Sequence, residues 1–322
     1  MLRFILRRLV QLAPVLLAIA TLNFLLLQLA PGDAADIIAG QSGHATPEMV
    51  AALRAEFGLD QPLWRQYIAY VGKLAVLDLG YSFQYQLPVS LLILERLPAT
   101  LLLMVPALLL AVGLGVVLGV TAARRRGGVV DGVVAVGALV VYATPVFWLG
   151  LMLIVLFSIQ LGWLPSGGMI NVRAGHTGLA YALDVARHLL LPVATMALFY
   201  VAIYTRLMRA SMLEVYSLDF ITTARAKGVS ATRVAWRHAA RNALLPVVTL
   251  AGVQFGHLLG GSVLVETVFG WPGLGRLVFD SLLQRDLNLL LGILFVSSVV
   301  VVLANLAVDL VYGLLDPRIV HK

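Results

Sequence analysis

Long apolar runs, separated by short polar stretches, extend over most of the chain. Six of them come near or exceed the length, about 20 residues, that an α-helix needs to cross the hydrocarbon core of a bilayer. These runs cover residues 9–30, 99–122, 133–161, 189–207, 243–265 and 287–306. A helix satisfies its own backbone hydrogen bonds, as the hydrocarbon core requires. The pattern therefore predicts an all-α integral membrane protein with six transmembrane helices.

Composition agrees with a membrane location and suggests an orientation. The 322 residues are 61% hydrophobic and 12% charged, with a net charge of +7 and no cysteine. With six spans both termini share one side, and 15 of the 23 Lys and Arg residues fall there. Because cytoplasmic loops are rich in Lys and Arg, both termini are predicted to be cytoplasmic. The basic charge then reflects topology, which argues against nucleic-acid binding, and the lack of cysteine excludes disulfides and thiolate metal sites.

The predicted spans divide the chain into three parts. Residues 1–30 form a basic N-terminal segment with the first helix, which is too long for the apolar core of a cleaved signal peptide. Residues 31–98 form an extracytoplasmic helical segment. Residues 99–322 form a five-helix core that contains a cytoplasmic segment at 209–242.

Two helices are predicted in the extracytoplasmic segment. Thr46 is a good N-cap, Pro47 suits the first helical position, and Gly58 suits the position just past the end. An amphipathic stretch follows at 62–77 and carries Trp and Tyr side chains. This second helix either rests on lipid headgroups, where Trp and Tyr are common, or forms a docking surface for an external partner.

The cytoplasmic segment 209–242 is predicted to form a helix, a turn and a second helix. Residues 214–227 lack Gly and Pro, and Gly228 can adopt the left-handed conformation that ends a helix. Ser230 can then cap the second helix.

Three arginines lie on one face of the second helix. Arg233, Arg237 and Arg241 recur every four residues. Like charges at this spacing are unfavourable, so we expect something negative to lie opposite them. Anionic lipid is one candidate. An acidic patch on a cytoplasmic partner is favoured, because lipid contact alone does not need a helix, a turn and a helix.

The stretch "DFITTARAKGVSATRVAWRHAARNALLPVV" at 219–248 closely resembles the cytoplasmic coupling loop of ABC-importer permeases of the dipeptide, oligopeptide and nickel branch. The resemblance covers nearly the whole chain, in matching order and spacing. It includes "LDLGYSF" at 77–83, "ERLPATL" at 95–101, "ATPVFWLGL" at 143–151, "LGWLPSGG" at 161–168, "ETVFGWPGLGRL" at 266–277 and "DLVYGLLDPR" at 309–318. It implies a type I ABC-importer permease architecture in a bacterial inner membrane.

The same resemblance implies several partners. These are a second homologous permease subunit, two cytoplasmic ATPase subunits that bind ATP and Mg²⁺, an extracytoplasmic solute-binding protein, and membrane lipid. The chain has no G-x-x-x-x-G-K-[ST] phosphate-binding pattern, so we expect a non-catalytic subunit without a cofactor or metal of its own. The expected cargo is di- or oligopeptides, and nickel or glutathione is the alternative.

The resemblance also carries over to individual positions of the coupling loop. An Ala and a Gly four residues apart mark the family's motif, and Ala224 and Gly228 match them. The family's Glu position is Thr222 here, and acidic residues occur earlier, at Glu214 and Asp219. Which acidic residue anchors the loop, if any does, therefore stays open. The other residues expected to couple to the ATPases are Arg225, Lys227, Arg233, Arg237 and His238.

Polar residues inside the predicted spans are candidates for the translocation path. They are Gln254, His257, Ser262 and Asn305. For each, the alternative is a hydrogen bond between packed helices. After the fifth span, Glu266 and Trp271 are candidates for an outer gate or a contact with the binding protein. Their alternative is a turn that only closes the helix bundle.

Two other classes of protein have less support. An ion-coupled secondary transporter needs ionisable residues inside its spans, and His257 and Asp309 are the clear candidates. A membrane enzyme would need a catalytic motif, and the chain has no HExxH, no G-x-S-x-G and no cluster of His and carboxylates at metal-ligand spacing.

Overall fold

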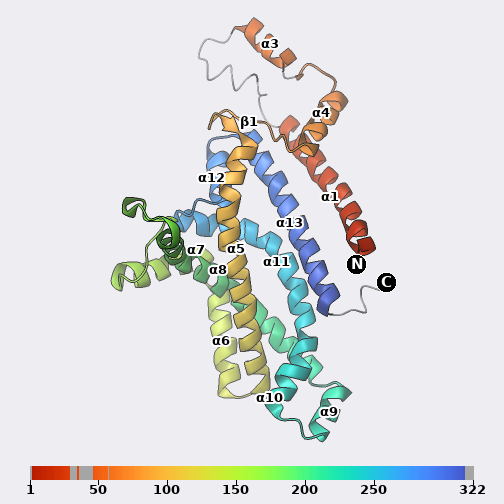
Figure 1. The fold of residues 1–322 in the computed structure, drawn as a ribbon, viewed down its shortest axis with the longest axis vertical. Helices are drawn as coiled ribbons and strands as arrows, with labels where there is room; N and C mark the ends of the chain where they lie inside the picture. Colours follow the sequence, from red (N-terminus) through yellow and green to blue (C-terminus); the bar gives the residue numbers. More distant parts are fainter. Residues whose placement is uncertain (1, 30–34, 36–45, 57, 316–322) are drawn as a thin grey trace. The chain divides into compact units, whose positions relative to one another are not determined.

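The structure is a computed structural model that describes residues 2–29, 35, 46–56 and 58–315. The described part is almost wholly helical, with one short two-stranded sheet (Figure 1). The chain forms two compact units. One consists of residues 1–95 and 278–302, and the other of residues 96–277 and 303–322.

The first unit begins with α1 (Leu2–Leu29) and α3 (Pro47–Glu56). Thr46 Oγ1 accepts a hydrogen bond from the N–H of Met49 at 3.3 Å, which satisfies one free donor of the first turn of α3. Gly58 has φ +67° and its N–H donates to Ala55 O at 3.2 Å. The predicted N-cap, first helical position and helix end are therefore confirmed.

Helix α4 (Leu63–Ala75) forms where the amphipathic stretch predicted it and packs on α1. The hydroxyls of Tyr67 and Thr21 are 2.7 Å apart, and the Phe24 ring lies 5.4 Å from that of Tyr67 and 5.8 Å from that of Tyr70. Trp64 is 59% exposed. One face of α4 is thus fixed to α1, and another is presented outward.

A β-hairpin that the apolar pattern did not predict completes this unit. β1 (Tyr81–Ser82) pairs antiparallel with β2 (Leu87–Pro88). The Ser82 hydroxyl donates to Asp286 Oδ2, and Asp286 Oδ1 accepts from the N–H of Leu289 at 3.1 Å. One buried carboxylate therefore holds the hairpin and caps the first turn of α13 (Leu287–Leu315).

The second unit is a helical bundle in which α8 packs against α6, α7 and α11. Its elements are most of α5 (Val89–Arg124), α6 (Val129–Ala143), α7 (Val146–Leu153), a π-helical segment (Ile154–Gln160), a 3₁₀ helix (Val172–Ala174), α8 (Gly178–Val215), α9 (Asp219–Ala226), α10 (Ala231–Arg233), a second π-helical segment (Val234–Ala239), α11 (Ala240–Phe269), the start of α12 (Leu274–Leu283) and the end of α13, from residue 303. The stretches 162–188 and 266–286, which join predicted spans and are rich in turn-forming residues, were expected to be outer loops. They are shorter than expected as loops, because α8 begins inside the first and α12 lies inside the second.

Small residues bring α5 and α8 together. A Cβ on Gly115 would lie 2.4 Å from Tyr204 Cβ, and one on Gly119 would lie 2.6 Å from Met208 Cβ. The two glycines form a G-x-x-x-G pattern, which lets membrane helices approach closely. This pattern is visible in the sequence, but the predictions above did not use it.

The prediction of one continuous helix over 133–161 is wrong. The two parts Val129–Ala143 and Val146–Gln160 are bent by 102° at Thr144 and Pro145. Both of these residues have extended backbones, with ψ of 127° and 132°. Proline has no N–H to donate and disfavours helical geometry in the residue before it, so the helix ends there.

Among the described residues, four helices are long and apolar enough to cross a membrane, or five if the bent pair counts as one span. They are found in α1, α5, α8 and α13. The predicted run 243–265 lies in α11, a single helix of 30 residues that continues through Pro246. A multi-span helical membrane protein is therefore confirmed, and the count of six stays a prediction.

Candidate functional site

Residues 209–242, which we call the coupling segment for the role predicted from the sequence, have the predicted turn at their centre. Gly228 has φ +75°. Its N–H donates to Arg225 O at 2.9 Å, and the N–H of Val229 donates to Ala224 O at 3.2 Å. This pair of bonds is the Schellman arrangement, which satisfies the last carbonyls of a helix by means of a left-handed residue. The left-handed helix end expected at Gly228 is confirmed.

The helix before this turn is shorter than the predicted 214–227. α8 ends at Val215, and the Ser217 hydroxyl donates to Glu214 O at 2.7 Å, so the chain turns before α9 begins at Asp219. Glu214 thus belongs to α8, whereas Asp219 lies in the first turn of α9. A carboxylate is favourable there because it faces the positive end of the helix dipole.

Ser230 occupies the N-cap position of α10, but its side chain makes no cap hydrogen bond. The prediction of a side-chain cap is wrong. The Ser230 carbonyl instead accepts from the N–H of Val234 at 2.9 Å, and the chain continues through the π-helical segment into α11. The second helix of the segment is therefore joined directly to a membrane-length helix.

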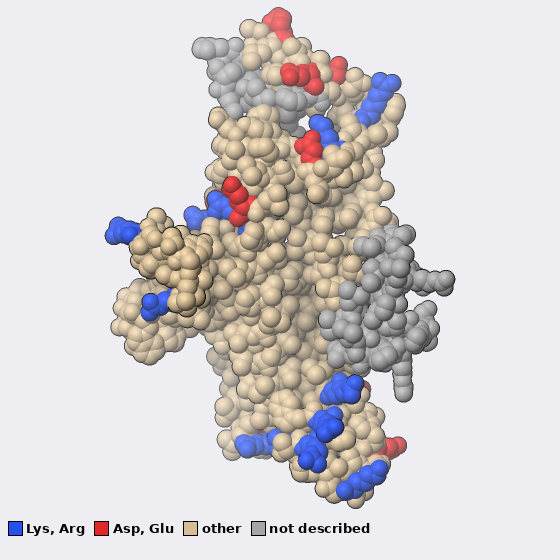
Figure 2. Space-filling model, viewed as in Figure 1, with Lys and Arg blue, Asp and Glu red and all other residues tan. Residues whose placement is uncertain are grey.

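Apolar and charged residues of the segment have separate positions. Ile221 and Ala224 are buried in the core of the second unit, at 0% and 7% exposure. Ala224, expected at the partner contact, therefore faces this chain's own core. The charged residues Glu214, Asp219, Arg225, Lys227, Arg233 and Arg237 are exposed, and His238 is half-buried. Figure 2 shows Lys and Arg side chains gathered over this end of the second unit.

Further contacts of the second unit hold the ends of its helices near this segment. Arg209 donates to Asp131 through Nε at 2.6 Å and Nη2 at 2.8 Å, and the N–H of Gly127 donates to Asp131 Oδ2 at 3.0 Å. Arg124 Nη2 donates to Thr232 Oγ1 at 2.9 Å. The fork-shaped Arg–carboxylate pair fixes α6 against α8. Sequence reasoning missed it because 78 positions separate its residues, although Asp131 is the single charge in an otherwise apolar helix.

The path candidates lie on two helices. Gln254, His257 and Ser262 are in α11, and Asn305 is in α13. Ser262 is buried and its hydroxyl donates to Leu259 O at 2.9 Å, a bond within α11 that does not join two helices. Gln254 is half-buried and Asn305 is exposed. The side chains of His257 and Asp309 lie outside the described part.

Glu266 and Trp271 form one buried cluster. Both are 0% exposed. Glu266 accepts from Thr100 Oγ1 at 2.8 Å and from the N–H of Arg276 at 2.9 Å, and Trp271 Nε1 donates to Ala99 O at 2.8 Å. These contacts favour the alternative of a turn that closes the bundle, because neither side chain is available to an external partner in this conformation.

No group of three or more His, Cys, Asp or Glu residues in the described part of the chain could hold a metal ion. Membrane-length helices and a structured basic turn define a polytopic helical membrane protein. Residues 115–321 match the family described as "Binding-protein-dependent transport system inner membrane component", and residues 1–104 match its N-terminal companion. The chain belongs to this family of permeases, which are multi-pass components of the inner membrane.

Several curated relatives match over their full length. The dipeptide transport system permease protein DppB of Escherichia coli (strain K12) is 41% identical over 339 aligned residues, covering the whole of both chains. The di/tripeptide transport system permease protein DppB of Pseudomonas aeruginosa (strain UCBPP-PA14) is 40% identical, again over the whole of both chains. A putative peptide transport system permease protein of Brucella abortus (strain 2308) is 42% identical over 98% of each chain.

Proposed function

We propose that this chain is a permease subunit of an ATP-driven importer of di- or oligopeptides in a bacterial inner membrane. The family membership and the peptide-transport names of three relatives from three genera support the proposal. Partners of the expected kinds complete the complex: a second permease subunit, two ATPases that bind ATP and Mg²⁺, and an external solute-binding protein. The six-span topology has both termini in the cytoplasm. Nickel and glutathione remain the alternative cargoes.

We further propose that the coupling segment transmits the movement of the ATPases. The observation that carries this proposal is the Schellman turn at Gly228, which is exposed while Ile221 and Ala224 are buried beside it. α9 packs on the π-helical segment Val234–Ala239, which leads without interruption into α11. A force applied to this turn would therefore reach a membrane helix as a rigid-body displacement.

Gly228→Trp tests this role. A Cβ at Gly228 meets nothing within 4 Å, so the cost within the chain is the left-handed backbone alone, about 1–2 kcal/mol. The indole would instead project outward, where the ATPase is expected to dock. We expect normal insertion and a loss of ATP-driven peptide uptake of at least tenfold. Membrane quantity and labelled dipeptide uptake are the two readouts.

Gly228→Asn is the matched control, because Asn tolerates the left-handed conformation without adding bulk. It should keep most of the uptake. Transport by Gly228→Trp at the wild-type rate would contradict the coupling role. Separately, loss of wild-type uptake on addition of a protonophore, with ATP held constant, would favour an ion-coupled transporter instead.

A further inference from the structure

A pocket of about 720 Å³ opens in the second unit, away from the coupling segment. Its walls are loop residues 162–165 and 170–173 and three side chains of α8, Asp184, Arg187 and His188. The volume lies within the range of about 300–1,000 Å³ that is usual for small-molecule sites. In the proposed topology this pocket faces the outside of the cell.

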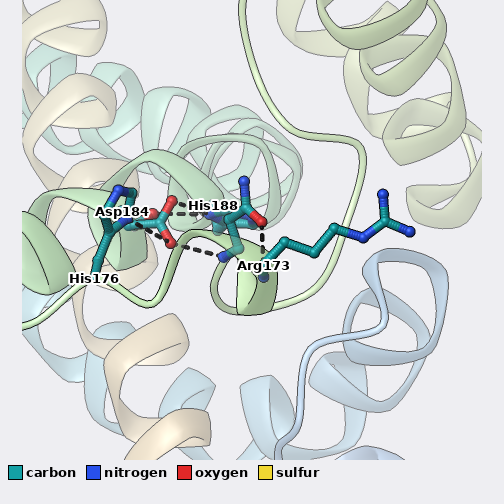
Figure 3. Close-up of polar contacts among 5 residues, drawn as sticks. Arg173, His176, Asp184 and His188 are labelled. Carbon is teal, nitrogen blue, oxygen red and sulfur yellow. Dashed lines mark hydrogen bonds and ion pairs between the residues drawn. The ribbon is translucent and has the colours of Figure 1, made fainter.

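Asp184 holds the loop that forms one wall of the pocket. Its Oδ2 accepts from the N–H of Asn171 at 2.7 Å and lies 3.7 Å from His176 Nδ1. Its Oδ1 lies 3.3 Å from His188 Nδ1. Figure 3 shows this carboxylate enclosed between the two histidines. The acidic group of the pocket is therefore already occupied by contacts within the chain.

The two arginines of the pocket have no such contacts. Neither Arg173 nor Arg187 makes a side-chain hydrogen bond or ion pair with another described residue, and both are exposed. Figure 3 shows the Arg173 side chain extended away from Asp184. Guanidinium groups bind carboxylates through two parallel hydrogen bonds.

We infer that this pocket is a subsite for the terminal carboxylate of a short peptide. Arg173 and Arg187 would receive the carboxylate, and the apolar wall, which includes Trp163 and Ile170, would receive a side chain of the peptide. This inference rests on the proposed function, because a peptide cargo supplies the carboxylate.

The test is equilibrium binding to the complete complex of permeases and ATPases in lipid nanodiscs, without the solute-binding protein. The probes are labelled dialanine and its C-terminal amide, which lacks the negative charge. We expect the free acid to bind at least tenfold more tightly than the amide. A site that bonds a polar group discriminates strongly against the analogue that lacks it.

Substitution of both arginines should remove this preference. In the double variant Arg173→Gln and Arg187→Gln, the free acid should bind only as weakly as the amide. The double change to Lys should give intermediate binding, because the charge remains and the fork is lost. Lys73→Gln, which removes an exposed cation of α4, is the matched control and should bind as wild type.

Equal binding of acid and amide, absence of peptide binding to the wild-type complex, or wild-type binding by the Gln double variant would overturn the inference. Uptake by cells that contain the binding protein separates the two proposals. If one of these binding results is found while wild-type cells still take up the peptide, only the subsite is wrong. If wild-type cells take up neither dipeptides nor oligopeptides, the proposed cargo is wrong as well.

Discussion

At the scale of single residues, glycines decide where helices meet in this protein. Gly115 allows α5 to touch α8 at Tyr204, whereas Gly113, two positions earlier on α5, has nothing within 4 Å of where its Cβ would be. The two glycines are on the same helix and have the same intrinsic helix propensity. They differ only in what lies beside them.

Gly115→Ala should therefore destabilise the protein and Gly113→Ala should not. A Cβ 2.4 Å from Tyr204 Cβ forces the helices apart, and overpacking of this kind costs about 1–3 kcal/mol. Alanine at 113 improves helix propensity by about 1 kcal/mol without any new contact. Thermal unfolding of the purified protein in detergent measures both. Equal midpoints for the two variants would contradict the close approach of α5 and α8.

Glycine also explains the buried turn after α11. A Cβ on Gly273 would lie 2.3 Å from Glu266 Oε1, and one on Gly275 would lie 2.7 Å from Val263 Cα. The motif that contains Glu266 and Trp271 is conspicuous in the sequence. However, its residue types are compatible with an exposed gate or with a closed turn, and only the partners of Glu266, among them Thr100, distinguish the two.

At the scale of elements, local signals predicted some helix ends correctly, but the side-chain cap at Ser230 and the long-range contacts were not predicted correctly. The end of α3 at Gly58 and the turn at Gly228 were predicted from single residues whose effect on the backbone extends over about one helical turn. The bend at Pro145 was missed although proline is also a local signal, because the prediction used the apolar run alone, and such a run reports solubility in lipid and not the direction of the chain. The pair of Asp131 and Arg209 depends on the packing of two helices, which no local pattern encodes.

That ion pair gives a prediction for α6 and α8. Arg209→Lys keeps the charge but loses the fork that binds both oxygens of Asp131. We expect a melting midpoint lower by a few degrees and slower ATP-driven uptake. Arg125→Lys, an exposed position with no described side-chain contact, is the control and should behave as wild type. A variant at 209 that matches this control would show that the pair does not position the helices.

At the scale of the whole molecule, the proposed orientation can be tested because the chain has no cysteine. Two single-cysteine variants serve as probes. Thr177→Cys places a thiol before α8, Thr222→Cys places one in α9, and both positions are exposed. A membrane-impermeant maleimide should label the first in intact cells and the second only after permeabilisation. The opposite pattern, or labelling of both in intact cells, would contradict the topology.

The bend between α6 and α7 also bears on how the protein is made. Each half of the pair has 15 residues, about 22 Å of helix, which is shorter than a bilayer core of about 30 Å. Neither half can therefore cross the membrane alone as a straight helix. α7 packs on α8 and α11, which are synthesised after it. We expect α6, α7 and the π-helical segment to enter the membrane together as one unbent apolar segment. The bend should form later, after α8 and α11 have been synthesised and α7 can pack on them.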